Sequence, residues 1–107
     1  MSQPLDSAPG TELFASYESD FQLTYSEIVQ KLQELNNLGP DQRKSGTQAI
    51  ERTIDEAYEI LDQLTVEVQN IASAQRGKFN SKLREYRSNV DKSKRELVRR
   101  EGLPSLL

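Results

Sequence analysis

The segment Phe79-Asn-Ser-Lys-Leu-Arg-Glu-Tyr-Arg-Ser-Asn-Val-Asp-Lys-Ser-Lys-Arg-Glu-Leu97 decides how the rest of the chain must fold. Its apolar residues recur at steps of four, three, four and seven, so they form one stripe along a helix: Phe79, Leu83, Tyr86, Val90 and Leu97. Basic side chains occupy most of the remaining surface. The stripe must be covered by apolar side chains from elsewhere in the chain, because burial of apolar surface is what stabilises such a helix.

Two upstream segments carry stripes of the same kind. In residues 12–36 an apolar residue recurs every seven positions, at Phe14, Phe21, Ile28 and Leu35. In residues 41–73 the same spacing is found at Ile50, Ala57, Leu64 and Ile71. Between them, Gly39 is expected to end the first helix in a left-handed conformation and Pro40 suits the first turn of the second. Gly77 is expected to separate the second helix from a third over residues 78–100.

Three amphipathic helices with short connections predict an all-α fold, an antiparallel up-down-up three-helix bundle with a left-handed twist. Residues 1–11 are predicted to be a disordered N-terminal tail in front of the bundle, with Thr11 as a plausible N-cap of the first helix. Residues 12–100 form the bundle, and residues 101–107, which contain Gly102 and Pro104, begin a linker.

Charge is divided unevenly along the chain. Residues 1–75 contain four bases and thirteen acids, whereas residues 76–107 contain ten bases and four acids. The favoured interpretation is that the basic third helix lies beside two acidic helices with solvated ion pairs along their edges. Within the helices, Glu27 with Lys31, Asp91 with Arg95, and Glu96 with Arg100 have the acid four residues before the base. The alternative is that part of the basic face docks an acidic partner.

Little in the sequence points to catalysis. The chain has no Cys and no His, which excludes zinc sites, thiol nucleophiles and Ser-His triads. No glycine-rich phosphate loop is present, and no cofactor or metal is predicted. Glu51, Asp55 and Glu59 share a helix face, for which a solvated surface is favoured over a weak cation site. Apolar runs of two or three residues predict no membrane span. The chain is therefore predicted to be a binding module and not an enzyme.

Some apolar residues fall off the stripes, and they are expected to become partner contacts if they cluster in the folded bundle: Val29, Tyr58, Val66 and Val98.

Three stretches resemble one family in order and spacing. They are Phe14-Ala-Ser-Tyr-Glu-Ser-Asp-Phe21, Ile60-Leu-Asp-Gln-Leu-Thr-Val-Glu-Val68 and Lys82-Leu-Arg-Glu-Tyr86. Over roughly residues 12–98 the chain is similar to the Golgi and endosomal SNARE family named as the vps ten tail interactor. The resemblance implies an Habc-type N-terminal domain, which in the family precedes a linker, a SNARE helix and a membrane anchor. Because the sequence stops at Leu107, it is expected to be the isolated, soluble N-terminal domain.

The resemblance also implies a function and partners. Such a domain is recognised by ENTH or ANTH domains of epsin-related clathrin adaptors, on the cytoplasmic face of Golgi, trans-Golgi, endosomal or vacuolar membranes. Other SNAREs would be bound through the missing SNARE helix, and the membrane through the missing anchor. By resemblance, the contact surface is expected on an exposed face of the first helix and on the loop between helices two and three, although no sharp motif marks it. The candidate contacts are Ser26, Glu27, Ala74, Gln75 and Arg76. Plain solvent exposure is the alternative for each residue, and fold-back onto the SNARE helix is an alternative role for the domain.

Two other functions are weighed against this one. A spectrin-like three-helix structural spacer or scaffold module has about this length, but that family typically buries a Trp in its first helix and this chain has none. Nucleic-acid binding through the basic third helix is disfavoured, because acidic helices lie beside it and no aromatic residue is interleaved on its basic face.

Overall fold

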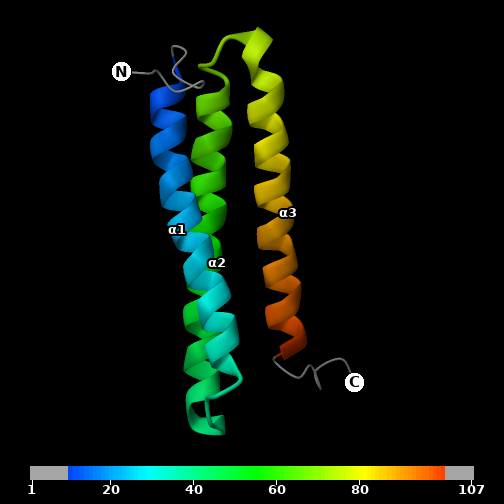
Figure 1. Cartoon of the computed structure of the whole chain (residues 1–107). Helices are drawn as coiled ribbons and strands as arrows, with labels where there is room; N and C mark the ends of the chain where they lie inside the picture. Colours follow the sequence, from blue (N-terminus) through cyan, green and yellow to red (C-terminus); the bar gives the residue numbers. More distant parts are fainter. Residues whose placement is uncertain (1–9, 101–107) are drawn as a thin grey trace, which may run out of the picture.

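The computed structural model describes residues 10–100, and over that range the chain forms three long α-helices and one turn of 3-10 helix (Figure 1). These elements are α1 (Thr11–Leu35), α2 (Pro40–Val68), η1 (Ser73–Gln75) and α3 (Arg76–Arg100). Successive α-helices run in opposite directions, and the described part of the chain contains no strand. The predicted antiparallel up-down-up three-helix bundle is confirmed. The left-handed twist stays a prediction, as do the tail and the linker where they fall outside residues 10–100.

The start of α1 differs from the prediction by one residue. Thr11 is buried as the first residue of the helix, and Gly10 takes the N-cap position with a φ of 89°. A Cβ atom on Gly10 would overlap the carbonyl oxygen of Asn70. Only glycine satisfies both the left-handed backbone and this close approach, so Gly10 holds the start of α1 against the turn that follows α2.

The turn between α1 and α2 corrects a second expectation. Gly39 has a φ of −75° and a ψ of 171°, so it is extended and forms no left-handed cap. Instead, α1 ends through turn hydrogen bonds, and Gly39 is the N-cap of α2 with Pro40 in the first turn, as predicted. The guanidinium of Arg43 donates to the carbonyl oxygens of Leu35 at 2.8 Å and Arg100 at 2.9 Å. Arg43 therefore joins the C-terminal ends of α1 and α3 by donating to a carbonyl group of each helix end.

The connection between α2 and α3 is longer than predicted. α2 ends at Val68 and not at residue 73, because the chain turns through Gln69 and Asn70 and is extended at Ala72. α3 begins at Arg76, so Gly77 lies inside the helix and does not break it. Ile71 lies outside α2 yet is 1% exposed. The stripe therefore identified a core residue correctly, although the helix had already ended.

The predicted stripes form one continuous core, in which Tyr86 is half-buried. Two aromatic contacts join α1 to α3: the ring centroids of Phe14 and Phe79 lie 4.8 Å apart, and those of Phe21 and Tyr86 lie 4.7 Å apart. Elsewhere, α1 and α3 each pack more closely on α2 than on one another. Buried hydrophobic residues of the core are Phe14, Phe21, Ile28, Leu32, Leu35, Ile50, Ile54, Ala57, Leu61, Leu64, Val68, Ile71, Phe79, Leu83, Val90 and Leu97.

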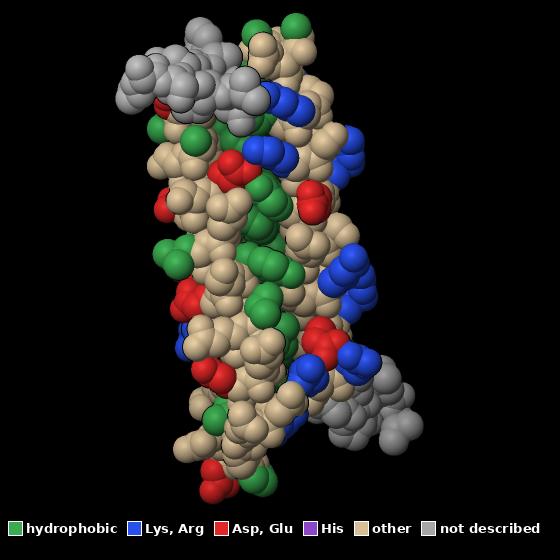
Figure 2. Space-filling model, viewed as in Figure 1, with side chains coloured by type: hydrophobic (Ala, Val, Ile, Leu, Met, Phe, Trp, Pro, Cys, Tyr) green, Lys and Arg blue, Asp and Glu red, His purple; other side chains and the backbone are tan. Residues whose placement is uncertain are grey.

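The surface shows how charge is distributed over this bundle. Figure 2 shows hydrophobic side chains along the seam between α1 and α3, with Lys and Arg side chains gathered over α3. Acidic side chains lie mostly over α1 on this face. The division of charge along the sequence therefore becomes a division between helices, as the composition of the two parts of the chain predicted.

Candidate partner-binding surface

The five predicted contact residues fall into two groups. Ser26 and Glu27 are exposed in α1, whereas Ala74 and Gln75 are exposed in η1, at the end of the bundle where α1 begins. Ser26 follows Thr11 by fifteen helical steps, which correspond to about 22 Å along α1. The structure therefore separates the two groups along the bundle. A partner with a standard interface of about 800 Å² on each side is large enough to cover both.

The fifth predicted residue, Arg76, has a structural role. Its guanidinium donates to the carbonyl oxygens of Ile71 at 2.8 Å and Gln69 at 3.0 Å, and the residue is half-buried. These bonds satisfy carbonyl groups that the end of α2 leaves without helical partners. Because Arg76 closes the connection between α2 and α3, its substitution would alter this connection as well as any partner contact.

Glu27 lies in an ion pair that the sequence predicted. The ammonium group of Lys31 is 3.3 Å from its carboxylate and 3.4 Å from the hydroxyl oxygen of Thr53 on α2. The side chains of Lys31 and Glu27 are 35% and 52% exposed to solvent, so the ion pair contributes at most about 1 kcal/mol to stability. Glu27 remains accessible to a partner in this arrangement.

An apolar residue that the periodicity analysis did not single out lies beside this pair. Leu23 is 73% exposed, the largest value among the exposed large hydrophobic residues of the described chain. Ser26 and Glu27 follow it by three and four residues, so the three side chains are neighbours on α1. Leu23 lies two residues after Phe21 and therefore off the buried stripe, and this position was the signal in the sequence that could have identified it.

The apolar residues that the sequence analysis did single out form no common patch. Val29 and Tyr58 are half-buried. Val66 is 54% exposed near the end of α2, and Val98 is 47% exposed near the end of α3. Because α2 and α3 run in opposite directions, these two valines lie at opposite ends of the bundle, and the expected clustering does not occur.

Tyrosine hydroxyls contact carboxylates between helices at two places. Tyr86 on α3 donates to Glu18 on α1, and Tyr58 on α2 donates to Asp91 on α3 with a distance of 2.5 Å. Burial first, and then the hydrogen bond to the carboxylate, raise the pKa of each tyrosine to about 12. The predicted pair of Asp91 with Arg95 is not formed, and Asp91 instead accepts the Tyr58 hydroxyl hydrogen through one carboxylate oxygen.

Local ion pairs at the end of α3 follow the sequence more closely. The guanidinium groups of Arg99 and Arg100 both donate to Glu96, which confirms the predicted pair of Glu96 with Arg100. These hydrogen bonds, from Arg99 first and then Arg100, lower the pKa of the Glu96 carboxyl group. Arg100 also donates to the side-chain oxygen of Asn36, which ties this end of α3 to the turn after α1.

No group of three or more acidic side chains within residues 10–100 is arranged to hold a metal ion, so the weak cation site considered at Glu51, Asp55 and Glu59 has no support. None of the helices in this range has the length and apolar character needed to cross a membrane.

Comparison with known proteins identifies the fold with a family. The family described as "Vesicle transport v-SNARE protein N-terminus" matches residues 11–101. The chain belongs to this v-SNARE N-terminal family. The predicted resemblance to the vps ten tail interactor SNAREs is thereby confirmed. The chain's relatives are SNARE proteins.

Relatives and a solved structure agree with this assignment. The chain is 31% identical over 86 residues to human "Vesicle transport through interaction with t-SNAREs homolog 1A", covering 80% of this chain and 40% of the relative. It is 33% identical over 82 residues to "t-SNARE VTI1" of Saccharomyces cerevisiae, covering 75% and 38%. The solution structure of an N-terminal domain of mouse Vti1a superimposes with a TM-score of 0.69 and 31% identity, covering 78% of this chain and 81% of that domain. The v-SNARE N-terminal chain thus spans about two fifths of the curated relatives' length.

Proposed function

We propose that this chain is the N-terminal regulatory and sorting domain of a SNARE that acts in vesicle traffic between the trans-Golgi network, endosomes and the vacuole or lysosome. It is recognised there by the ENTH or ANTH domain of an epsin-related clathrin adaptor. The family match over residues 11–101 supports a SNARE N-terminal domain. The names of the relatives, which refer to vesicle transport and to t-SNAREs, support the trafficking role. Other SNAREs would be engaged by a SNARE helix outside this domain.

The observation that carries the adaptor-binding part is the exposed Leu23 beside Ser26 and Glu27. An apolar side chain that is exposed in the free domain and surrounded by polar residues is typical of the anchor of a binding surface. Glu27 adds a charge that can pair with a basic adaptor side chain. Ala74 and Gln75, at the end of the bundle, provide a second contact region for the same partner.

The experiment is an NMR titration of this domain with the ENTH domain of an epsin-related adaptor. Chemical-shift changes are expected to cluster at Leu23, Ser26 and Glu27, with a second group at Ala74 and Gln75. No shift changes with near-millimolar partner would refute adaptor recognition. Shift changes confined to another face would leave the adaptor as partner and reject this surface.

Two matched substitutions locate the surface independently. Leu23→Ser is expected to weaken adaptor binding about tenfold or more, because a central apolar anchor contributes more than about 1.4 kcal/mol. Val98→Ser removes a 47% exposed apolar side chain from α3, at the end of the bundle opposite Ala74 and Gln75, and serves as the control. Circular dichroism confirms that both variants keep their helices. An equal loss of binding in both would show that Leu23 is not the anchor.

A further inference from the structure

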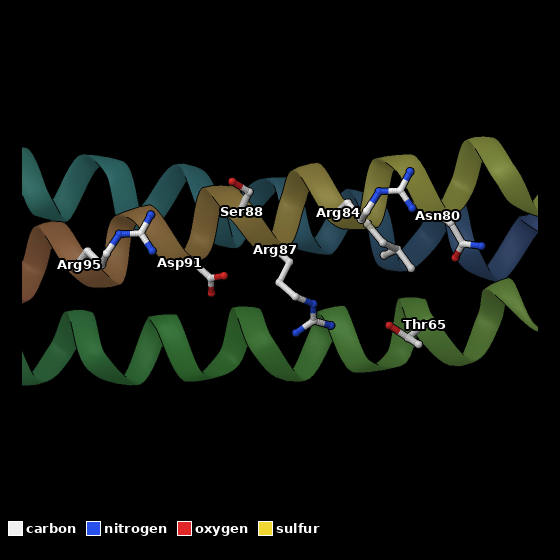
Figure 3. A pocket seen from close by; sticks show the side chains of 8 residues that line it. Thr65, Asn80, Arg84, Arg87, Ser88, Asp91 and Arg95 are labelled. Carbon is white, nitrogen blue, oxygen red and sulfur yellow. The ribbon is translucent and has the colours of Figure 1, made fainter.

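A hollow of about 600 Å³ lies between α2 and α3, on a different surface from the one proposed for the adaptor. Figure 3 shows the side chain of Arg87 reaching from α3 toward α2, where Thr65 lies across from it. Most of the polar groups around the hollow are hydrogen-bond donors, and three of them are guanidinium groups. The lining residues are Thr65, Asn80, Leu83, Arg84, Arg87, Ser88, Asp91 and Arg95.

The one acidic residue in this lining is already engaged. Asp91 accepts the hydroxyl hydrogen of Tyr58 at 2.5 Å. Arg87 and Arg95 each lie four residues from Asp91, at the spacing that normally forms an ion pair. Among residues 10–100, neither arginine forms a hydrogen bond or an ion pair, and Arg84 donates only to the neutral hydroxyl of Ser81, at 3.2 Å. The hollow therefore presents three arginines without a carboxylate partner.

An apolar surface continues this hollow toward the end of α3. Val98 follows Arg95 by three residues, is 47% exposed, and lines a shallow depression of about 420 Å³ with Lys94, Arg95 and Arg99. On the α2 side of the same region, Glu51 and Asp55 line a neighbouring depression. The groove thus leads from the cationic hollow to Val98, which lies among basic side chains of α3 and faces acids of α2.

We infer that this α2–α3 groove binds an acidic segment of another protein. Carboxylates of the segment contact Arg84, Arg87 and Arg95, and an apolar side chain that follows them packs on Val98. Guanidinium groups bind carboxylates through paired hydrogen bonds, which suits arginines that lack an internal partner. Glu51 and Asp55 of α2 lie beside Val98 and not beside Arg84. They would repel a carboxylate of the segment near Val98, so the apolar side chain of the segment is placed there and its carboxylates toward Arg84.

The spacing of the arginines favours a protein segment over other anions. Arg84 and Arg95 are eleven helical residues apart, which corresponds to about 16 Å along α3. About five residues of extended peptide or three turns of helix span this length, whereas a single lipid headgroup contacts only part of it. A membrane surface or a nucleic acid is larger, so it would also approach Glu51 and Asp55 and be repelled by them. The net charge of −3 on the whole chain also disfavours such extended anionic partners.

The first experiment measures fluorescence anisotropy with a labelled peptide of five consecutive glutamates followed by a leucine. Its counterpart with five glutamines is the control peptide. The acidic peptide is expected to bind and to dissociate as salt is raised, and the glutamine peptide is expected not to bind. Equal binding of the two peptides, or no binding of the acidic one, would overturn the inference. Stronger binding to vesicles that contain a phosphoinositide would assign the groove to lipid and overturn the choice of partner.

A pair of double variants with the same change in net charge tests the position of the site. Arg87→Gln with Arg95→Gln is expected to weaken the acidic peptide about tenfold or more. The control is Lys44→Gln with Lys92→Gln, which removes two exposed charges that do not line the hollow. An equal loss in both double variants would show attraction without a defined site and overturn the inference.

A third test uses Tyr58 as a positioning residue. Tyr58→Phe releases Asp91, which is then free to pair with Arg87 or Arg95 and compete with the peptide. Peptide affinity is expected to fall several-fold although no residue of the cationic lining is changed. Adding Tyr58→Phe to Asp91→Asn leaves no competitor to release, so this double variant is expected to bind the peptide as tightly as Asp91→Asn alone. A weaker affinity of the double variant than of Asp91→Asn alone would show a general structural effect and contradict the proposed arrangement.

Discussion

Replacement of Tyr86 by Phe tests the contact between α1 and α3, which pack less closely on each other than on α2. The hydroxyl of Tyr86 donates to the carboxylate of Glu18, while its ring packs on Phe21 with the centroids 4.7 Å apart. The ammonium group of Lys82 lies 3.3 Å from the same carboxylate. Tyr86→Phe removes only the hydroxyl and leaves the ring contact in place.

The expected loss follows from the surroundings of this hydroxyl. A hydrogen bond to a charged group contributes about 1.5–3 kcal/mol. Tyr86 is only half-buried and Lys82 still accompanies Glu18 in the variant, so we expect a loss of about 1 kcal/mol in the free energy of unfolding. For a domain of this size that corresponds to a decrease of about 4–8 °C in Tm. Tyr86→Ala also removes the ring and its contact with Phe21, and we expect a total loss of about 3 kcal/mol.

The assay is urea unfolding followed by far-ultraviolet circular dichroism in a double-mutant cycle. The four proteins are the parent, Tyr86→Phe, Glu18→Ala and the double variant. A coupling of about 1 kcal/mol between the two positions is expected because the two groups form one hydrogen bond. Parent-like stability of Tyr86→Phe together with zero coupling would refute the assignment of this bond as a contributor to the bundle.

Three further predictions concern the core, the start of α1 and alkaline pH. Leu61→Ala is expected to cost about 2–5 kcal/mol of unfolding free energy, since Leu61 is 0% exposed. Leu23→Ala at the exposed surface should change it by less than about 0.5 kcal/mol, and equal melting temperatures would contradict the core assignment. Gly10→Ala is expected to lower stability by about 1–3 kcal/mol, because a Cβ atom would overlap the chain after α2 at a positive φ; an unchanged melting curve would argue against that contact. The pKa values of Tyr58 and Tyr86 are raised to about 12 from 10, so their stabilisation is fully present below pH 10 and lost as the pH rises from 10 through 12. Alkaline unfolding curves should show this loss in the parent, and the double substitution to Phe should reduce it.

The candidate partner surface could be predicted only in part from the sequence. The family resemblance pointed to α1 and to the connection after α2, and four of the five residues are exposed there. The fifth residue, Arg76, instead holds the connection between α2 and α3. It donates to the carbonyl groups of Gln69 and Ile71, which lack a helical partner because α2 ends at Val68. A helix end depends on local backbone geometry that periodicity does not contain.

The sequence by itself determined most of the buried core and two of the three predicted local ion pairs. The seven-residue spacing identified the core, including Ile71, because residues at that spacing lie on one side of a helix whatever it packs against. Glu96 and Arg100 pair because both lie on one helix. Only the tertiary structure decided that Tyr58 takes Asp91 away from Arg95. That contact joins residues thirty-three apart on two helices, so it depends on how the helices rotate and align against each other, which the pattern within either helix does not specify.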